Sequence, residues 1–154
     1  MNPCTKPARP HRWRPRHSLI SFMNSLLLSG ADALRLKNIL DDLVIPHPNL
    51  EQRNALTEIL AKAKVPKDDC ALESRVGFHD RITLVSPTDS RDFFNLEIVM
   101  PDGADIDHDR ISVQMPICLA TLGKRCGENV SWPAHGGTRE MRIISIVKQE
   151  LVAG

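Results

Sequence analysis

The chain has no tyrosine, and aromatic residues make up only 4% of its 154 positions. Proteins that hold single-stranded nucleic acid stack its bases on exposed aromatic rings, so this composition disfavours such a site. The hydrophobic fraction is nevertheless 42%. We therefore expect a core of Leu, Ile and Val in about one domain with an appendage.

Paired metal-binding cysteines are also missing. Cys4, Cys70, Cys118 and Cys126 are scattered, without a CxxC pair or a neighbouring HxxxH motif. This spacing predicts reduced, buried thiols rather than a zinc site. No run approaches the roughly 20 apolar residues that cross a bilayer. The sequence predicts a cytoplasmic protein with no metal and no membrane partner.

The signatures of common catalytic sites are absent as well. There is no Walker loop and no GxGxxG, GxSxG or HExxH motif. Asp102, Asp105, Asp107 and Asp109 share one loop, but counting an EF-hand from Asp105 places Arg110 where glycine is needed. We expect a solvated acidic loop, no cofactor, and a chain that is not an enzyme.

The formal net charge of +1 conceals an asymmetry. Residues 1–31 hold five basic residues and no acid, whereas residues 32–154 hold 15 Lys and Arg against 19 Asp and Glu. Four prolines accompany the basic residues of positions 1–17, a composition that favours disorder. We predict a flexible basic tail over residues 1–28. It is either a passive extension, the favoured interpretation, or an arm with weak affinity for nucleic-acid phosphates.

The same tail has the order of regions found in a signal peptide. Arg-rich residues 9–16 precede an apolar run, Leu19–Leu28, and small residues follow. Polar residues interrupt the run, which argues against secretion. A natural start at Met23, with residues 1–22 as an upstream extension, explains the same pattern.

Two amphipathic helices are predicted within residues 29–67. Ser29 and Asn49 are suited to cap them, and each helix has an apolar stripe at helical spacing. The stripes are Leu36, Ile39, Leu40, Leu43 and Leu56, Ile59, Leu60, Ala63. Pro46 and Pro48 separate the helices. We expect a short antiparallel hairpin with helices of about 14–16 residues, roughly 20–24 Å long.

Residues 68–154 have the pattern of a sheet domain. The β-rich runs are Leu72–Phe78, Ile82–Val85, Phe93–Val99, Ile111–Met115, Glu128–Trp132 and Arg139–Val147. Pro116 can open a short helix that Gly123 closes, and Gly136 lies in a hairpin turn between the last two runs. We predict an α+β fold in which the helical hairpin precedes an antiparallel sheet with one short helix.

Several motifs of this domain resemble a known family. Residues 110–128, RISVQMPICLATLGKRCGE, are similar to the "RIS…SP…A.LGK..GD" stretch of the GreA/GreB C-terminal domain. Residues 72–78, LESRVGF, and residues 130–137 resemble motifs of Rnk, the regulator of nucleoside diphosphate kinase, the nearest match within this family. The resemblance spans residues 26–152 in family order.

This resemblance implies an FKBP-like sheet domain that docks on bacterial RNA polymerase at the rim of its secondary channel, with the hairpin directed inward. In Gre factors, acidic residues at the hairpin tip help to position a polymerase magnesium ion that activates water for RNA cleavage. The tip here, residues 44–49, has no carboxylate; Asp41 and Asp42 precede it and Glu51 follows it. We expect a transcription elongation regulator that occupies the channel without stimulating RNA cleavage.

For the polymerase contact, the resemblance points to Pro116, Ile117, Gly123 and Lys124. Lys124 is favoured because a basic, exposed helix end suits an acidic partner surface. Three alternatives remain open: a true Gre-type transcript cleavage factor, a Rnk-like regulator that affects nucleotide metabolism indirectly, and an FKBP-type prolyl isomerase. The last needs an aromatic-lined pocket, for which the chain has little material.

Overall fold

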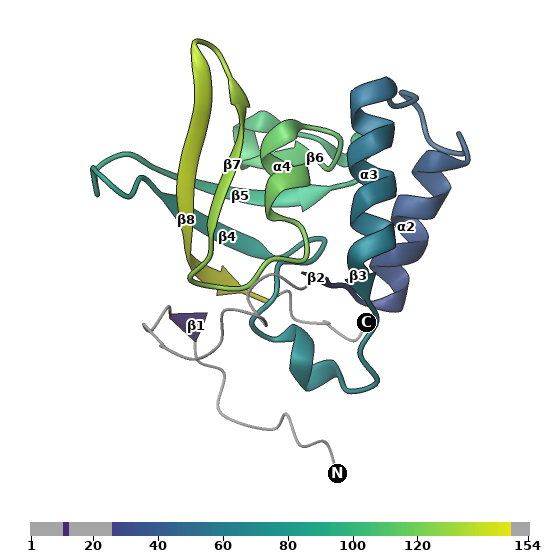
Figure 1. Ribbon diagram of the computed structural model, residues 1–154, viewed down its shortest axis with the longest axis horizontal. Coiled ribbons are helices and arrows are strands. Elements are labelled where there is room, and N and C mark those ends of the chain that lie inside the picture. Colours follow the sequence, from purple (N-terminus) through teal and green to yellow (C-terminus); the bar gives the residue numbers. More distant parts are fainter. Residues whose placement is uncertain (1–10, 13–25, 149–154) are drawn as a thin grey trace.

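The computed structural model describes residues 11–12 and 26–148, which form a helical hairpin beside a curled sheet (Figure 1). The strand order is β1-β8-β4-β5-β6, and β7 also pairs with β8. The strands are β1 His11–Arg12, β4 Arg81–Val85, β5 Phe93–Val99, β6 Arg110–Ser112, β7 Asn129–Ala134 and β8 Gly137–Val147. Within the described residues, no helix is long and apolar enough to span a membrane.

The mixed α+β class is confirmed, but the sheet is not wholly antiparallel. The β4–β5 and β7–β8 hairpins are antiparallel, as predicted. Strand β6 instead runs parallel to β5, with Glu97 opposite Arg110 and Val99 opposite Ser112. The connection between the two strands explains the parallel pairing. Residues 100–109 return through two short 3-10 helices to the level of Glu97, and β6 then runs in the same direction as β5.

The core lies on the inner face of the curled sheet. Alternate residues of β4, β5 and β8 point to this face because side chains alternate along a strand. They are Ile82, Leu84, Leu96, Ile98, Met141 and Ile143. Helix α4, Pro116–Thr121, covers them through buried Cys118, with Leu122 just after the helix. Pro116 is at its first turn, as predicted, where a missing N–H costs nothing.

Helices α2, Gly30–Leu40, and α3, Leu50–Lys62, form the predicted hairpin but are shorter than expected. Ser29 accepts a hydrogen bond from the N–H of Asp32, and Asn49 and Gln52 form a full capping box. Helix α2 ends early because Asp42 adopts a left-handed conformation, with φ of 60°. Leu43, expected on the buried stripe, is therefore 71% exposed.

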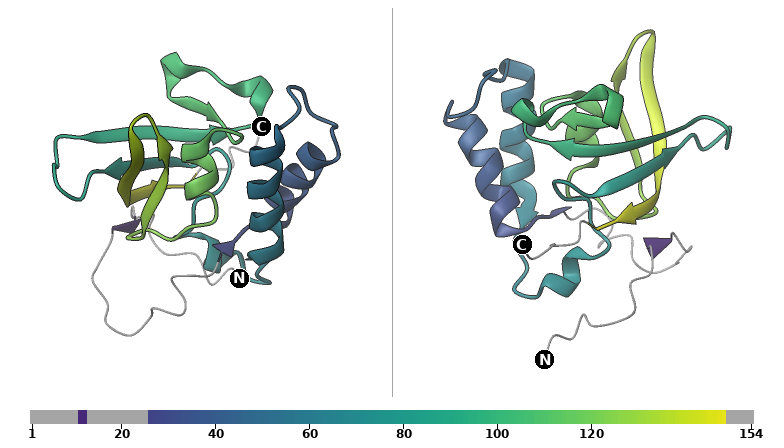
Figure 2. Two further views of the ribbon diagram at one scale, coloured as in Figure 1. Left: turned by 45° about the horizontal axis from the view of Figure 1, so that its top comes forward. Right: turned by 180° about the vertical axis from the view of Figure 1, so that it is seen from behind.

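The hairpin stands along one side of the sheet domain, and α3 rather than α2 faces α4 (Figure 2). At its base, strand β2, Leu26–Leu27, pairs in parallel with β3, Ala63–Lys64. The parallel pair fastens the chain before the hairpin to the chain after it.

Two predicted boundaries are wrong. The flexible tail was expected to reach residue 28, but Leu26 and Leu28 are buried core residues. Residues 72–78 do not form a regular strand: a 3-10 helix occupies Asp69–Leu72 and a single bridge joins Arg75 to Arg125. Positions 1–10, 13–25 and 149–154 are outside the described residues, and so are most of the tail and the proposed start at Met23.

Candidate functional site

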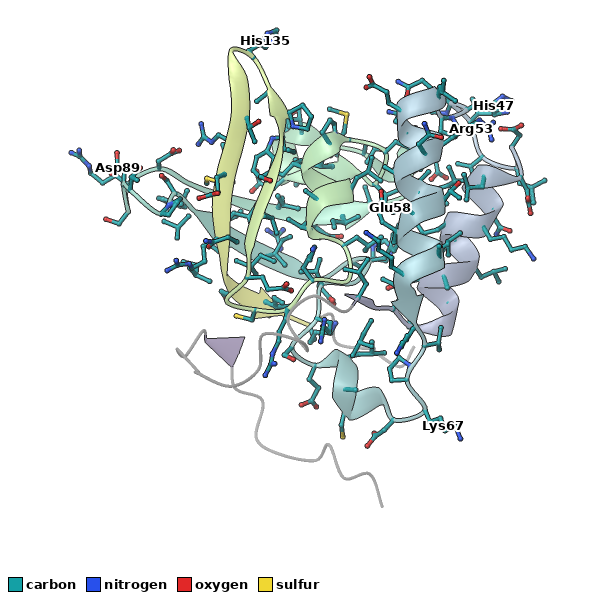
Figure 3. The ribbon with its side chains drawn as sticks, viewed as in Figure 1. His47, Arg53, Glu58, Lys67, Asp89 and His135 are labelled. Atoms are coloured by element: carbon teal, nitrogen blue, oxygen red, sulfur yellow. The ribbon has the colours of Figure 1, made fainter. Side chains whose placement is uncertain are left out.

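The hairpin tip holds the three acidic candidates. Asp41 follows the last turn of α2 and Glu51 lies in the first turn of α3, and both are exposed. Asp42 is different, because its carboxylate accepts a hydrogen bond from the Arg53 guanidinium, which also donates to the carbonyl of Leu40 at 3.0 Å. Arg53 and His47 lie at this end of the hairpin in Figure 3. All three carboxylates are thus exposed at the tip, and that of Asp42 is paired with Arg53.

The tip is fastened to the sheet domain by two amide side chains. Gln114 donates from its Nε2 to the carbonyl of Pro46 at 2.9 Å. Gln52 donates from its Nε2 to the carbonyl of Gln114 at 3.0 Å. Gln114 is only 4% exposed. Because a buried amide needs such partners, these bonds define where the tip rests.

The base of the hairpin is fastened by Asp32. Its carboxylate accepts from the N–H of Phe78 at 3.2 Å and from the Arg35 guanidinium at 2.6 Å. Arg35 also lies over the Phe78 ring, 5.4 Å from its centroid. Asp80 supports the same turn, since its carboxylate accepts from the N–H of Gly77 at 2.9 Å. The hairpin is therefore attached at both ends.

The four predicted contact residues surround α4 but differ in exposure. Pro116 is exposed, Ile117 is half-buried against the core, and Lys124 is half-buried beside α3. Gly123 is buried in a turn with φ of +78°, a left-handed conformation that other residues rarely adopt. Gly123 therefore shapes the turn. Whether any of the four contacts a partner stays a prediction.

A groove of about 320 Å³ lies between α3 on one side and α4 with β7 on the other. Leu26, Ile59 and Leu122 line its apolar part. At its rim, Lys62 donates to Glu58 at 2.6 Å, and this bond lowers the pKa of the Glu58 carboxyl. The groove is open to solvent, and the Glu58 carboxylate at its rim is paired with Lys62.

Two cysteines of the sheet domain, Cys118 and Cys126, are shielded from solvent. Burial raises the pKa of Cys118 to about 12 and raises that of Cys126, so neither is a ready nucleophile. Cys70 is disulfide-bonded, against the expectation of reduced thiols. In the acidic loop, a hydrogen bond from His108 holds the pKa of Asp105 below its usual value. No three His, Cys, Asp or Glu side chains of residues 11–12 and 26–148 are grouped to hold a metal.

Sequence patterns did not reveal that Gln52, Gln114 and Asp32 join the hairpin to the sheet domain. Gln52 and Asp32 were assigned only to helix caps, and Gln114 carried no signal of its own. Their partners are 62, 68 and 46 residues away in the sequence. Local spacing carries no information about such contacts.

Comparison with known proteins finds relatives of the sheet domain. Residues 71–148 match the family "Transcription elongation factor, GreA/GreB, C-term". The transcription elongation factor GreA of Magnetococcus marinus is 29% identical over 91 residues, and that of Acidiphilium cryptum is 32% identical over 91 residues. Each alignment covers 59% of this chain and 57% of the relative. The chain thus spans little more than half the length of the curated relatives it matches.

A solved structure shares the fold over more of the chain than the family match covers. The prokaryotic transcription elongation factor GreA/GreB from Nitrosomonas europaea is 26% identical, with a TM-score of 0.65. The match covers 80% of this chain and 98% of that one. Because 80% exceeds the extent of the sheet domain, the shared fold includes elements outside residues 71–148.

These comparisons contradict one prediction. We expected that the chain is not an enzyme, whereas the relatives are named transcription elongation factor GreA, a transcript cleavage factor, although the cleavage is stimulation of RNA polymerase's own activity. The prediction rested on catalytic motifs sought within one chain, and the relatives are matched on the sheet domain rather than on such motifs. With its sheet domain matched over residues 71–148, the chain belongs to the GreA/GreB family.

Proposed function

We propose that the chain binds RNA polymerase and regulates transcription elongation from the secondary channel. The sheet domain docks at the channel rim in this proposal, and the hairpin points inward. The match of residues 71–148 to the GreA/GreB C-terminal domain carries it. The fold of the Nitrosomonas europaea factor supports it.

The hairpin geometry supports a short reach into the channel. Helices α2 and α3 have 11 and 13 residues, which correspond to about 16–20 Å at 1.5 Å per residue. Both ends of the hairpin are fastened to the sheet domain by hydrogen bonds. The tip thus keeps a fixed position relative to the docking domain. Docking of that domain would set how deep the tip lies.

The carboxylates of the tip are the groups that could take part in RNA cleavage. Asp42 pairs with Arg53, so its carboxylate is engaged within the hairpin. Magnesium recruits carboxylate oxygens that are available to it. Because Asp42 is paired with Arg53 and the hairpin is short, we expect the chain to occupy the channel without stimulating RNA cleavage. This is the first candidate function.

A Gre-type cleavage factor is the second candidate. Exposed Asp41 and Glu51 favour it, since both carboxylates lie at the tip and face solvent. A carboxylate there could help a polymerase magnesium ion to activate water.

Stalled, backtracked elongation complexes test both candidates in one assay. Increasing amounts of the chain are added with a fixed amount of GreB, and RNA shortening is followed with and without GreB. We expect the chain to suppress GreB-dependent shortening and to cause none alone. Shortening by the chain alone would select the second candidate. If GreB-dependent shortening is unchanged at saturating chain, the proposed function is wrong.

Paired substitutions assign any cleavage to the tip. Asp41→Asn/Glu51→Gln removes the two tip carboxylates that are not paired with Arg53 while keeping their shape. Asp102→Asn/Asp107→Asn removes two exposed carboxylates from the acidic loop and serves as the matched control. Loss of shortening in the first variant alone would place the effect at the tip.

A weak nucleic-acid contact by the basic tail is a separate part of the proposal. Affinity from phosphate neutralisation falls steeply with salt. Deletion of residues 1–22 should therefore abolish any salt-dependent DNA binding and leave polymerase binding intact. Equal DNA binding with and without residues 1–22 would remove the tail from the proposal.

A further inference from the structure

The disulfide bond of Cys70 has a partner that elimination identifies. The chain has four cysteines, at positions 4, 70, 118 and 126. Cys118 and Cys126 are free thiols, whereas Cys70 is disulfide-bonded. Within one chain, the cysteine that is left to pair with Cys70 is Cys4, which lies outside the described residues. The pairing would join the basic N-terminal segment to the sheet domain.

The described part of this segment, strand β1, already lies on the sheet. Strand β1 runs antiparallel to β8, with His11 opposite Ile146. Strand β4 occupies the other edge of β8 at this level, with Ile82 opposite Ile146. Strand β7 pairs with β8 only as far as Arg142. Because an unpaired strand edge exposes backbone donors and acceptors, β1 covers an edge that β7 leaves open.

Cys70 and β1 lie at the same end of the molecule. The 3-10 helix that contains Cys70 lies near β1 and the end of β8 (Figures 1 and 2). Lys148, just after β8, donates from its Nζ to the carbonyl of Arg75 at 2.9 Å, which ties the chain after this helix to the end of β8. Cys4 precedes His11 by seven positions, and seven residues span at most about 25 Å. A bond at Cys70 is therefore within reach of the segment that carries β1.

We propose that Cys4 and Cys70 form a disulfide bond that holds β1 on the edge of β8, so that reduction of this bond releases the basic N-terminal segment. Formation of the bond oxidises the two thiols, and glutathione disulfide takes up their two electrons and two protons to become two molecules of glutathione. Reduction is the reverse exchange. Strand β1 has two residues, and without the bond its few backbone contacts must offset the entropy lost on ordering the segment.

Release of the segment changes where its charge can act. Residues 1–31 hold five basic residues and no acid. A released basic arm can follow nucleic-acid phosphates, whereas an arm fastened at Cys70 and at the edge of β8 is held against the sheet domain. This consequence rests on the weak nucleic-acid contact of the proposed function. The disulfide and the release of β1 do not depend on it.

Peptide mapping tests the pairing. The full chain is equilibrated with glutathione and glutathione disulfide, free thiols are alkylated during unfolding, and a digest is analysed by mass spectrometry without reduction. We expect one crosslinked peptide pair that contains Cys4 and Cys70, with Cys118 and Cys126 alkylated, and a monomer on a non-reducing gel. Any other pairing, a disulfide-linked dimer, or alkylation of Cys4 and Cys70 under these conditions would overturn the proposal.

Amide hydrogen exchange tests whether the bond holds β1. We expect faster exchange at residues 145–146 in the reduced chain than in the oxidised chain, and unchanged exchange at residues 139–142, which β7 pairs in both states. Cys70→Ser should exchange like the reduced chain even in oxidising buffer. Cys126→Ser is the matched control, because it removes a free thiol of the same domain and should exchange like the oxidised parent. Equal exchange at residues 145–146 in the two redox states would overturn the release of β1.

Binding of a short DNA duplex tests the consequence and separates it from the function on which it rests. Each additional phosphate contact steepens the fall of log affinity with log salt by about 0.9. We expect a steeper slope for the reduced chain and for Cys70→Ser than for the oxidised chain. Equal slopes in chains that bind DNA would overturn control of the arm by the bond. If neither redox form binds DNA, the proposed nucleic-acid contact is wrong, and mapping and exchange still decide on the disulfide and the release of β1.

Discussion

At the scale of single residues, Asp32 joins the hairpin to the sheet domain. Asp32 is buried beside the turn that contains Phe78. Its carboxylate accepts a hydrogen bond from the Phe78 N–H at 3.2 Å. The adjacent Gly77 N–H is bound by Asp80. Two carboxylates thus satisfy two successive backbone donors that no strand partner reaches. A buried donor left without a partner costs more than the bond itself contributes.

The Asp32→Ala variant should therefore lose about 1–3 kcal/mol in its free energy of unfolding. The loss comes from the unpaired N–H of Phe78 and from the freed Arg35. Urea unfolding measures it. Asp102→Ala removes an exposed aspartate and should change stability by less than about 0.5 kcal/mol. Equal stability of the two variants would show that Asp32 does not join the parts.

Cys118 should be almost inert in the folded chain. Burial raises the pKa of its thiol from 9.0 to about 12, so its thiolate fraction at pH 8 is about a thousandfold below that of an ordinary thiol. Labelling with Ellman's reagent, followed by peptide mapping, should modify Cys118 only after unfolding. The unfolded chain loses this proton first, so the contribution of Cys118 to stability is full below pH 9 and is lost as the pH rises towards 12. Rapid labelling of Cys118 in the folded chain would contradict this.

At the scale of elements, the helix caps and strand β5 followed from local chemistry. Ser29 and Asn49 cap α2 and α3, and β5 has the predicted bounds Phe93–Val99 because its residues favour strands. Features that depend on how distant segments of the chain meet could not be predicted from local chemistry. Leu43 continues the helical spacing, yet the chain leaves the helix at Asp42. The parallel pairing of β6 depends on how a ten-residue connection turns, which side-chain periodicity does not encode.

The Asn49 cap gives a prediction for α3. Asn49→Ala removes the acceptor for the Gln52 N–H, which lies at 2.8 Å, and should lower the free energy of unfolding by about 1 kcal/mol. Asn54→Ala makes the same change at an exposed position inside α3 and should be neutral or slightly stabilising, because Ala favours helix. Thermal unfolding followed by circular dichroism compares the two. A larger loss in Asn54→Ala would contradict the assigned cap.

At the scale of the whole molecule, the hairpin lies along the sheet domain and is fastened at both ends. The hairpin tip and the start of α4 therefore lie together at one end (Figure 1). The β4–β5 turn, marked by Asp89, lies at the side of the sheet away from the hairpin (Figure 3). If the molecule enters the polymerase channel tip first, these two regions must have different neighbours.

Photo-crosslinking to polymerase tests this orientation most directly. A photoreactive amino acid replaces His47 at the tip in one variant and Asp89 in a second, and crosslinked polymerase peptides are mapped for each. The account predicts that position 47 crosslinks to peptides that line the secondary channel and that position 89 does not. Crosslinks from position 89 inside the channel, or none from position 47 in a chain that binds polymerase, would contradict it.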